Sequence, residues 1–154
     1  MSSRSEIEFR KALKSDIPPL VELRIKQLVE EGYPEVSDIR QALVGYFSSS
    51  LKDGSLVCWV GISGGSIIAT AGLCFYQLPP TFSNPTGRIA YLTNMYTVEA
   101  CRRIGIASQL VDKLLTEAKA LNYTSVKLHA SHQGKGIYEQ AGFVIADGYM
   151  GLKL

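Results

Sequence analysis

The chain has 154 residues, of which 46% are hydrophobic and 19% charged; this profile predicts one folded domain spanning residues 1–154 and argues against disorder. A net charge of +2 is too small to indicate a nucleic-acid partner, and three cysteines without a CxxC pair argue against a disulfide framework or a metal site. The N-terminus lacks the apolar core of a signal peptide and no apolar run reaches the ~18 residues of a membrane span, so we expect a cytoplasmic protein without a membrane partner.

The first third of the chain predicts a strand and two helices. Residues 7–13 alternate in polarity as a half-buried strand does. Ser15-Asp16 is a helix-start signal, and Gly32 ends the apolar periodicity that follows it. Residues 37–51 repeat this pattern and predict the second helix.

The middle of the chain predicts an antiparallel meander. Segments 55–62 and 66–76 are rich in β-branched and aromatic residues and flank the sequence SGG at 63–65, which is typical of a hairpin turn. A proline-rich loop at 77–87 separates them from a long predicted strand at 88–98.

The last third predicts a helix at 106–121, a strand at 125–130, a short helix ended by Gly142 and a final strand at 149–154. Strand 88–98, helix 106–121 and strand 125–130 would form a right-handed parallel βαβ unit. The sequence therefore predicts an α/β protein with a mixed sheet and helices on both faces.

Two arginines precede the predicted helix at 106–121. Arg102 and Arg103 stand just before Gly105, although a helix start already favours negative charge through its dipole and its unpaired N–H groups. This arrangement suits a phosphate arriving from outside, and an ordinary turn with solvated arginines is the alternative. The motifs GxxxxGK[ST] and GxGxxG are absent, which argues against an NTPase and a Rossmann dehydrogenase.

Two motifs resemble a known family. Residues 102–107 read RRIGIA and match the [R/Q]-x-x-G-x-[G/A] signature of the GNAT acetyltransferases, and residues 129–143 are similar to that family's later segment, with Tyr138 followed by Gly142-Phe143. The order of predicted elements also matches, so the resemblance covers essentially the whole chain. It implies a GNAT-like fold with six or seven mostly antiparallel strands, a central parallel pair that splays apart, and about four helices on both faces.

The resemblance implies acetyl-CoA as cosubstrate and no metal. Backbone N–H groups from about Arg103 to Ser108 would hold its pyrophosphate, helped by the two arginine side chains, and the strand at 95–97 would bind the pantetheine arm. Ser131 matches a position that is often polar near the cofactor. The expected cofactor-binding residues are Met95, Tyr96, Thr97, Arg102, Arg103, Ile104, Gly105, Ile106, Ala107, Ser108 and Ser131.

The resemblance also assigns catalytic roles. Tyr138 would be the acid that protonates the departing thiolate, since a phenol with a pKa of about 10 keeps its proton at neutral pH. The strand at 88–98 carries no carboxylate, so the base stays open between Tyr96, a water relay, and Glu30 or Glu31. The family transfers acetyl directly in a ternary complex, which disfavours Cys101 as a nucleophile.

The acceptor site is expected at residues 30–38 and 77–87. The first segment is acidic and carries Tyr33, which suits a cationic amine, so the expected acceptor is a small-molecule amine or a peptide. One alternative is a catalytically silent CoA-binding sensor or regulatory module. Another is a weak nucleic-acid binder, which the near-neutral charge disfavours. A homodimer stays open.

Overall fold

The computed structural model of the chain describes residues 6–146 and 148–154. Its centre is one five-stranded sheet in the order β1-β2-β3-β4-β5. The strands are β1 (Glu8–Lys11), β2 (Leu56–Ser63), β3 (Ser66–Gln77), β4 (Arg88–Thr97) and β5 (Val126–Leu128). Neighbouring strands are antiparallel except β4 and β5, which are parallel.

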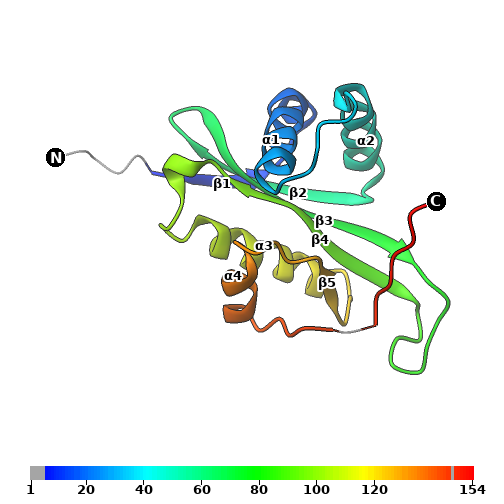
Figure 1. The fold of residues 1–154 in the computed structure, drawn as a ribbon. Coiled ribbons are helices and arrows are strands. Elements are labelled where there is room, and N and C mark those ends of the chain that lie inside the picture. The colour runs from blue at the N-terminus through cyan, green and yellow to red at the C-terminus, as the bar shows by residue number, and fades with distance from the viewer. Residues whose placement is uncertain (1–5, 147) are drawn as a thin grey trace.

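Helices cover both faces of the sheet. Helices α1 (Ile17–Glu30) and α2 (Arg40–Asp53) lie on one face, and α3 (Ile106–Ala120) and α4 (Lys135–Gln140) lie on the other (Figure 1). The predicted mixed fold and the predicted element order are confirmed as far as α4. No helix within the described ranges is long and apolar enough to span a bilayer.

Each face of the sheet has its own apolar core. On the α3 face, Leu73 and Leu92 pack with the buried stripe of α3 that includes Leu110 and Leu114. On the other face, side chains of α1 and α2 pack against β2, and the fully buried members include Leu20, Phe47 and Val60. The sheet is therefore held from both sides, which fixes the elements that carry the site described below.

A bulge interrupts β4 at Asn94. The register between β3 and β4 shifts by one residue, so that Asn94 and Met95 together lie opposite Ala71. Asn94 has a φ of 56°, in the left-handed region that asparagine tolerates better than most residues. Thr70 Oγ1 donates to the Asn94 carbonyl at 2.8 Å and holds the bulge. Such an extra residue bends a strand and increases its twist.

Past the bulge, β4 has no described neighbour on its β5 side. The two strands pair only from Ala90–Val126 to Leu92–Leu128, whereas β4 continues to Thr97. The predicted divergence of the two parallel strands is confirmed. It leaves one edge of β4 unpaired immediately before the chain reaches α3.

The prediction of a final strand at 149–154 is wrong. Residues 144–146 and 148–154 contain no strand, and the described part of the sheet has five strands, with the parallel pair at its edge instead of its centre. The alternation of residues 149–154 is typical of a strand, but no described strand pairs with them through backbone hydrogen bonds.

Candidate active site

The start of α3 carries a run of unpaired donors. Gly105 is the N-cap, with a φ of 86°, and no side chain caps the helix. Within the described residues, the backbone N–H groups from Arg103 to Ser108 find no acceptor. Space is open where a Cβ of Gly105 would stand, so a ligand can approach the chain there. The donor set is made of N–H groups alone and therefore fits an anion.

The two arginines of the motif, Arg102 and Arg103, differ in their contacts. Arg102 pairs with Glu30 of α1 at 2.6 Å, and its Nε donates to the Thr97 carbonyl at 2.8 Å. Arg103 is exposed and has no hydrogen bond or ion pair in the described part of the chain. Only Arg103 therefore keeps its guanidinium free for an incoming anion, whereas Arg102 ties β4 to α1.

The three β4 residues expected to bind the pantetheine arm differ in what they leave free. The Met95 side chain packs into the core on the α3 face. Tyr96 is buried on the α1 side, where its hydroxyl donates to Glu30 at 2.7 Å. The carbonyl of Thr97 already accepts from Arg102. The free backbone edge at this point therefore centres on Met95 and Tyr96.

Tyr138 lies on α4 and is 7% exposed. Burial, and then the nearby carboxylate of Glu31, raise the pKa of its phenol to about 12. Its hydroxyl makes no hydrogen bond to any described residue. A Cβ at Gly134 would stand 2.9 Å from the Tyr138 ring, so the glycine allows the ring to pack over the start of α4. The result is a protonated phenol whose proton is uncommitted.

Ser131 serves the turn that leads into α4. Its Oγ accepts from the Gly134 N–H at 3.1 Å, and its carbonyl accepts from the same group at 3.2 Å. The residue expected to contact the cofactor thus also shapes the turn that carries Tyr138. A contact of its hydroxyl proton with a ligand stays a prediction.

A groove of about 460 Å³ opens beside Tyr138. It runs between β5, α4 and the segment that follows α4. Most of its lining is aromatic or aliphatic, and these side chains include Tyr76, Tyr91, Leu128, Tyr138, Phe143 and Tyr149. The lining is mostly apolar, but it also includes the hydroxyl group of Tyr138 and the charged side chains of Lys127, Lys135 and Glu139.

The acidic groups predicted near the acceptor are not equivalent. The Glu30 carboxylate binds both Arg102 and Tyr96, and these hydrogen bonds, led by that of Arg102, lower its pKa. Among the described residues, the Glu31 carboxylate accepts a single hydrogen bond, from Gln27 at 3.0 Å, and its charge contributes to the raised pKa of the Tyr138 phenol. Glu31 therefore keeps more free hydrogen-bonding capacity than Glu30 does.

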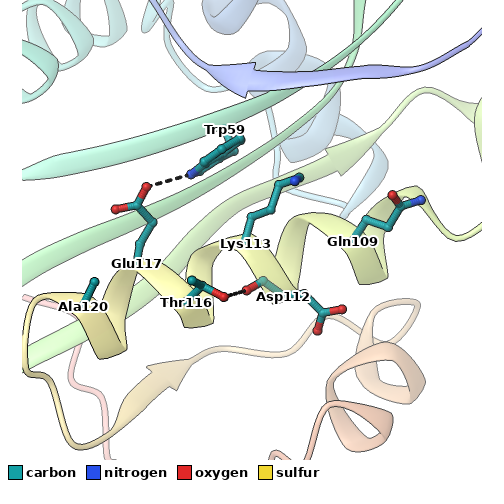
Figure 2. A pocket seen from close by; sticks show the side chains of 7 residues that line it. All are labelled: Trp59, Gln109, Asp112, Lys113, Thr116, Glu117 and Ala120. Atoms are coloured by element: carbon teal, nitrogen blue, oxygen red, sulfur yellow. Dashed lines mark hydrogen bonds between the residues drawn. The ribbon is translucent and has the colours of Figure 1, made fainter.

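A second hollow, of about 580 Å³, lies between α3 and β2 (Figure 2). Several of its polar groups contact one another or side chains of β1. Trp59 donates to Glu117 at 3.3 Å, Lys11 pairs with Glu117 at 2.7 Å, and Lys113 sits over the rings of Phe9 and Trp59. It holds none of the predicted site residues, and we do not assign it to the active site.

Sequence reasoning missed two features of the site. The pairing of Arg102 with Glu30 joins residues 72 apart, which no local pattern reveals. The bulge at Asn94 breaks a run that otherwise alternates as a regular strand. Cys101 packs against the core on the α3 face. In the ranges that the structure describes, no group of His, Cys, Asp and Glu could hold a metal ion.

Comparisons with known proteins agree with this geometry. The sequence model of the acetyltransferase (GNAT) family matches residues 20–143. A crystal structure of a predicted acetyltransferase with acetyl-CoA from Clostridium acetobutylicum is 40% identical, with 96% of each chain covered and a TM-score of 0.93. No curated protein sequence gives a significant match.

More distant structures share the fold. A GCN5-related N-acetyltransferase from Ralstonia eutropha JMP134 is 23% identical, with 96% of this chain and 99% of that one covered and a TM-score of 0.85. Glucosamine-6-phosphate N-acetyltransferase from Arabidopsis thaliana is 20% identical, with 96% and 98% covered and a TM-score of 0.75.

Proposed function

Because the chain belongs to the acetyltransferase (GNAT) family, we propose that it transfers an acetyl group from acetyl-CoA to an amine by direct attack in a ternary complex. The observation that carries this proposal is the combination of two features. One is the run of unpaired N–H groups from Arg103 to Ser108 beside the open edge of β4. The other is the uncommitted hydroxyl of Tyr138.

The start of α3 supplies the binding part of the proposal. Its unpaired N–H groups carry partial positive charges at the helix start, and the helix dipole adds to them. Arg103 can add a charge-assisted hydrogen bond without breaking any existing contact. These residues would hold the diphosphate of acetyl-CoA, and the open edge of β4 at Met95 and Tyr96 would hold its extended arm.

Acetyl-CoA supplies the acetyl group as an activated thioester. The amine nitrogen forms a bond to the acetyl carbon while the carbon–sulfur bond breaks. Tyr138 donates its proton to the departing sulfur, and its raised pKa keeps that proton in place throughout the neutral range. Backbone N–H groups near Met95 and Tyr96 stabilise the negative charge that develops on the acetyl oxygen.

Glu31 is the residue we propose for the proton lost by the amine. Its charge contributes to the raised pKa of the Tyr138 phenol, and among the described residues its carboxylate accepts a single hydrogen bond, from Gln27. Glu30 is a weaker candidate because Arg102 and Tyr96 occupy both of its oxygens. Tyr96 is also weaker, because burial and the bond to Glu30 raise its pKa to about 12. The negative charge of Glu31 would also favour a cationic acceptor, either a small amine or the amino group of a peptide.

Two assays test the proposal in sequence. Acetyl-CoA at about 100 times its dissociation constant should stabilise the protein by about 2.7 kcal/mol, seen as a rise in Tm. Release of free thiol from acetyl-CoA, followed across a panel of amines, should then identify an acceptor. No rise in Tm would contradict the cofactor assignment.

A silent CoA-binding module is the second candidate function. The absence of a carboxylate on β4 favours it, because no acid of that strand can take the proton of the amine. It predicts the same rise in Tm but no thiol release with any amine. The same two assays therefore separate the two functions.

A further inference from the structure

Two glycines of the α4 region differ in the space that their missing side chains leave. A Cβ at Gly136, inside α4, would meet no side chain of the described residues within 4 Å, its chain neighbours aside. A Cβ at Gly134, the N-cap of α4, would stand 2.9 Å from Cε2 and 3.5 Å from Cζ of the Tyr138 ring. Contacts of a real Cβ closer than 3.0 Å are essentially never seen. The Tyr138 ring therefore occupies the place that a side chain at Gly134 would need.

The backbone of Gly134 does not require a glycine. Its φ of −85° and ψ of −15° lie in the right-handed helical region, which residues with a side chain adopt readily. Its peptide groups are also held in place, because its N–H donates to the Ser131 Oγ at 3.1 Å and its carbonyl accepts from the Ile137 N–H at 3.1 Å. A methyl group at position 134 would therefore act on the Tyr138 ring, since the backbone that carries the methyl is fixed.

The Tyr138 ring is packed on part of its surface and borders open space on another part. It belongs to the buried core of the α3 face, and Phe143 packs against it edge to face, with the ring centroids 5.9 Å apart. It also lines the groove beside β5 and α4. A core packed at native density resists displacement. The groove, in contrast, offers space to a displaced ring without disrupting the core.

The displacement that a methyl group would cause is small but large enough to affect chemistry. Ordinary van der Waals contact of a Cβ begins at 3.4 Å, so a methyl group at Gly134 would move Cε2 of Tyr138 by about half an ångström. The Ser131 Oγ, 3.2 Å from the same Cβ position, adds a second tight contact. Proton transfer requires heavy-atom distances of about 2.6–3.2 Å, and a misplacement of ~1 Å in an active site can lower a rate about 100-fold.

We propose that Gly134 is a positioning residue for the phenol of Tyr138. The absence of a side chain at position 134 lets the ring lie against the start of α4 and so determines where its hydroxyl is placed. No described residue makes a hydrogen bond to this hydroxyl that could hold it instead. The inference rests on the proposed function, because the position of the hydroxyl affects the rate only if Tyr138 donates its proton to the sulfur.

The first experiment compares Gly134→Ala with Gly136→Ala. Both substitutions add one methyl group to the α4 region, but only the first places it against the Tyr138 ring. With the acceptor that the amine screen identifies, Gly134→Ala should lower kcat for thiol release at least ~10-fold, while KM for acetyl-CoA stays as in the wild type. Gly136→Ala should keep both values. An unchanged kcat in Gly134→Ala, or an equal loss in both variants, would overturn the proposal.

The second experiment separates the hydroxyl from the ring that carries it. Tyr138→Phe keeps the ring and its contact with position 134 but lacks the hydroxyl, so adding Gly134→Ala to it should lower kcat no further. A further loss of comparable size would contradict the proposal, because the methyl group would then act on the rate by another route. If Tyr138→Phe alone keeps the wild-type kcat, the proton-donor assignment and this inference both fail. A slow Tyr138→Phe beside an unaffected Gly134→Ala overturns this inference alone.

The third experiment needs no acceptor. In protein labelled with carbon-13 tyrosine, the Cζ signal of Tyr138 is assigned by its absence from Tyr138→Phe, and it should shift in Gly134→Ala but not in Gly136→Ala. If Gly134→Ala does not fold, the double variant Gly134→Ala/Tyr138→Leu should fold as Tyr138→Leu does, because the ring that meets the methyl group is absent. An unshifted signal in Gly134→Ala, or a double variant that unfolds where Tyr138→Leu folds, would show that position 134 does not act through this ring and would refute the proposal.

Discussion

The hydroxyl of Tyr96 donates a hydrogen bond to Oε1 of Glu30 over 2.7 Å and joins the end of α1 to β4 just past its bulge. The other carboxylate oxygen of Glu30 accepts from Arg102 at 2.6 Å, and the Arg102 side chain lies over the Tyr96 ring. These contacts fix the position of the open β4 edge relative to the start of α3. Arg102, for which anion binding stays a prediction, is held between α1 and β4 by these contacts.

Replacing Glu30 should make stability less dependent on acid pH. The hydrogen bonds from Arg102 and Tyr96 lower the pKa of Glu30 below its ordinary value of 4.5. A pKa lowered by folding stabilises the fold above the unfolded value, and this contribution is lost as the pH falls through the folded value. Glu30→Gln should therefore cost up to about 1 kcal/mol at neutral pH and nothing in strong acid, because both partners keep about a third of their surface exposed.

Urea unfolding at a series of pH values measures this difference. Glu22→Gln breaks the more exposed pair with Arg40 and is the matched control, for which we expect a smaller change. An equal cost of Glu30→Gln at neutral and acid pH would show that the ion pair is not its source.

Gly105→Ala should weaken acetyl-CoA binding beyond its effect on stability. Gly105 has φ 86° and ψ 10°, so any side chain there costs about 1–2 kcal/mol of backbone strain. Gly54→Ala is a close control, since Gly54 has φ 79° and ψ 7° and also faces open space. Both variants should lose similar stability, but calorimetry should find acetyl-CoA binding weakened at least ~10-fold only in Gly105→Ala. Equal acetyl-CoA affinity in the two variants would contradict the assignment of the acetyl-CoA site to the start of α3.

Glu31→Gln should slow transfer to the amine. If Glu31 takes the proton of the amine, its loss should lower kcat/KM by about 100-fold at neutral pH, with acetyl-CoA affinity unchanged. Glu35→Gln removes an exposed carboxylate from the same segment and should leave the rate unchanged. The measurement is thiol release with the acceptor that the amine screen identifies. An unaltered rate in Glu31→Gln would contradict Glu31 as the base and favour a water relay in its place.

Replacing Asn94 with glycine should destabilise the fold less than replacing it with alanine. Its φ of 56° strains alanine by about 1–2 kcal/mol, whereas glycine adopts it freely. Its buried amide makes no hydrogen bond to the described residues, so both variants lose the same side-chain contacts. Asn94→Gly should therefore unfold at higher urea than Asn94→Ala. At the neighbouring Thr93, which has an ordinary strand conformation, the order should reverse. The same order at both positions would contradict the left-handed bulge.

Local patterns predicted most of the framework. The structure contains the predicted apolar stripe of α3, the SGG hairpin between β2 and β3, and the βαβ unit. These features could be predicted because they depend on the periodicity and turn residues of short stretches of sequence. The RRIGIA motif also predicted an unpaired helix start at Gly105, and the structure confirms the open donors there.

Contacts between residues far apart in the sequence could not be predicted from local patterns. The alternation of residues 149–154 is typical of a strand, but whether a sheet edge is available to them depends on the rest of the fold, and the described structure pairs them with none. Glu30, the partner of Arg102, lies 72 residues away in the sequence, so no local pattern could indicate this pair. The bulge at Asn94 is held by a hydrogen bond from Thr70, on another strand, and it lies where β4 continues beyond its pairing with β5.

The most direct test of the central claim is the rate of thiol release by Tyr138→Phe, measured together with its affinity for acetyl-CoA. The substitution removes one oxygen, and Tyr76→Phe does the same elsewhere in the groove. Our account predicts that Tyr138→Phe loses about 100-fold or more in kcat and binds acetyl-CoA as the wild type does, whereas Tyr76→Phe keeps its kcat. An unchanged kcat in Tyr138→Phe would contradict the assignment of the proton donor and, with it, the proposed chemistry of this site.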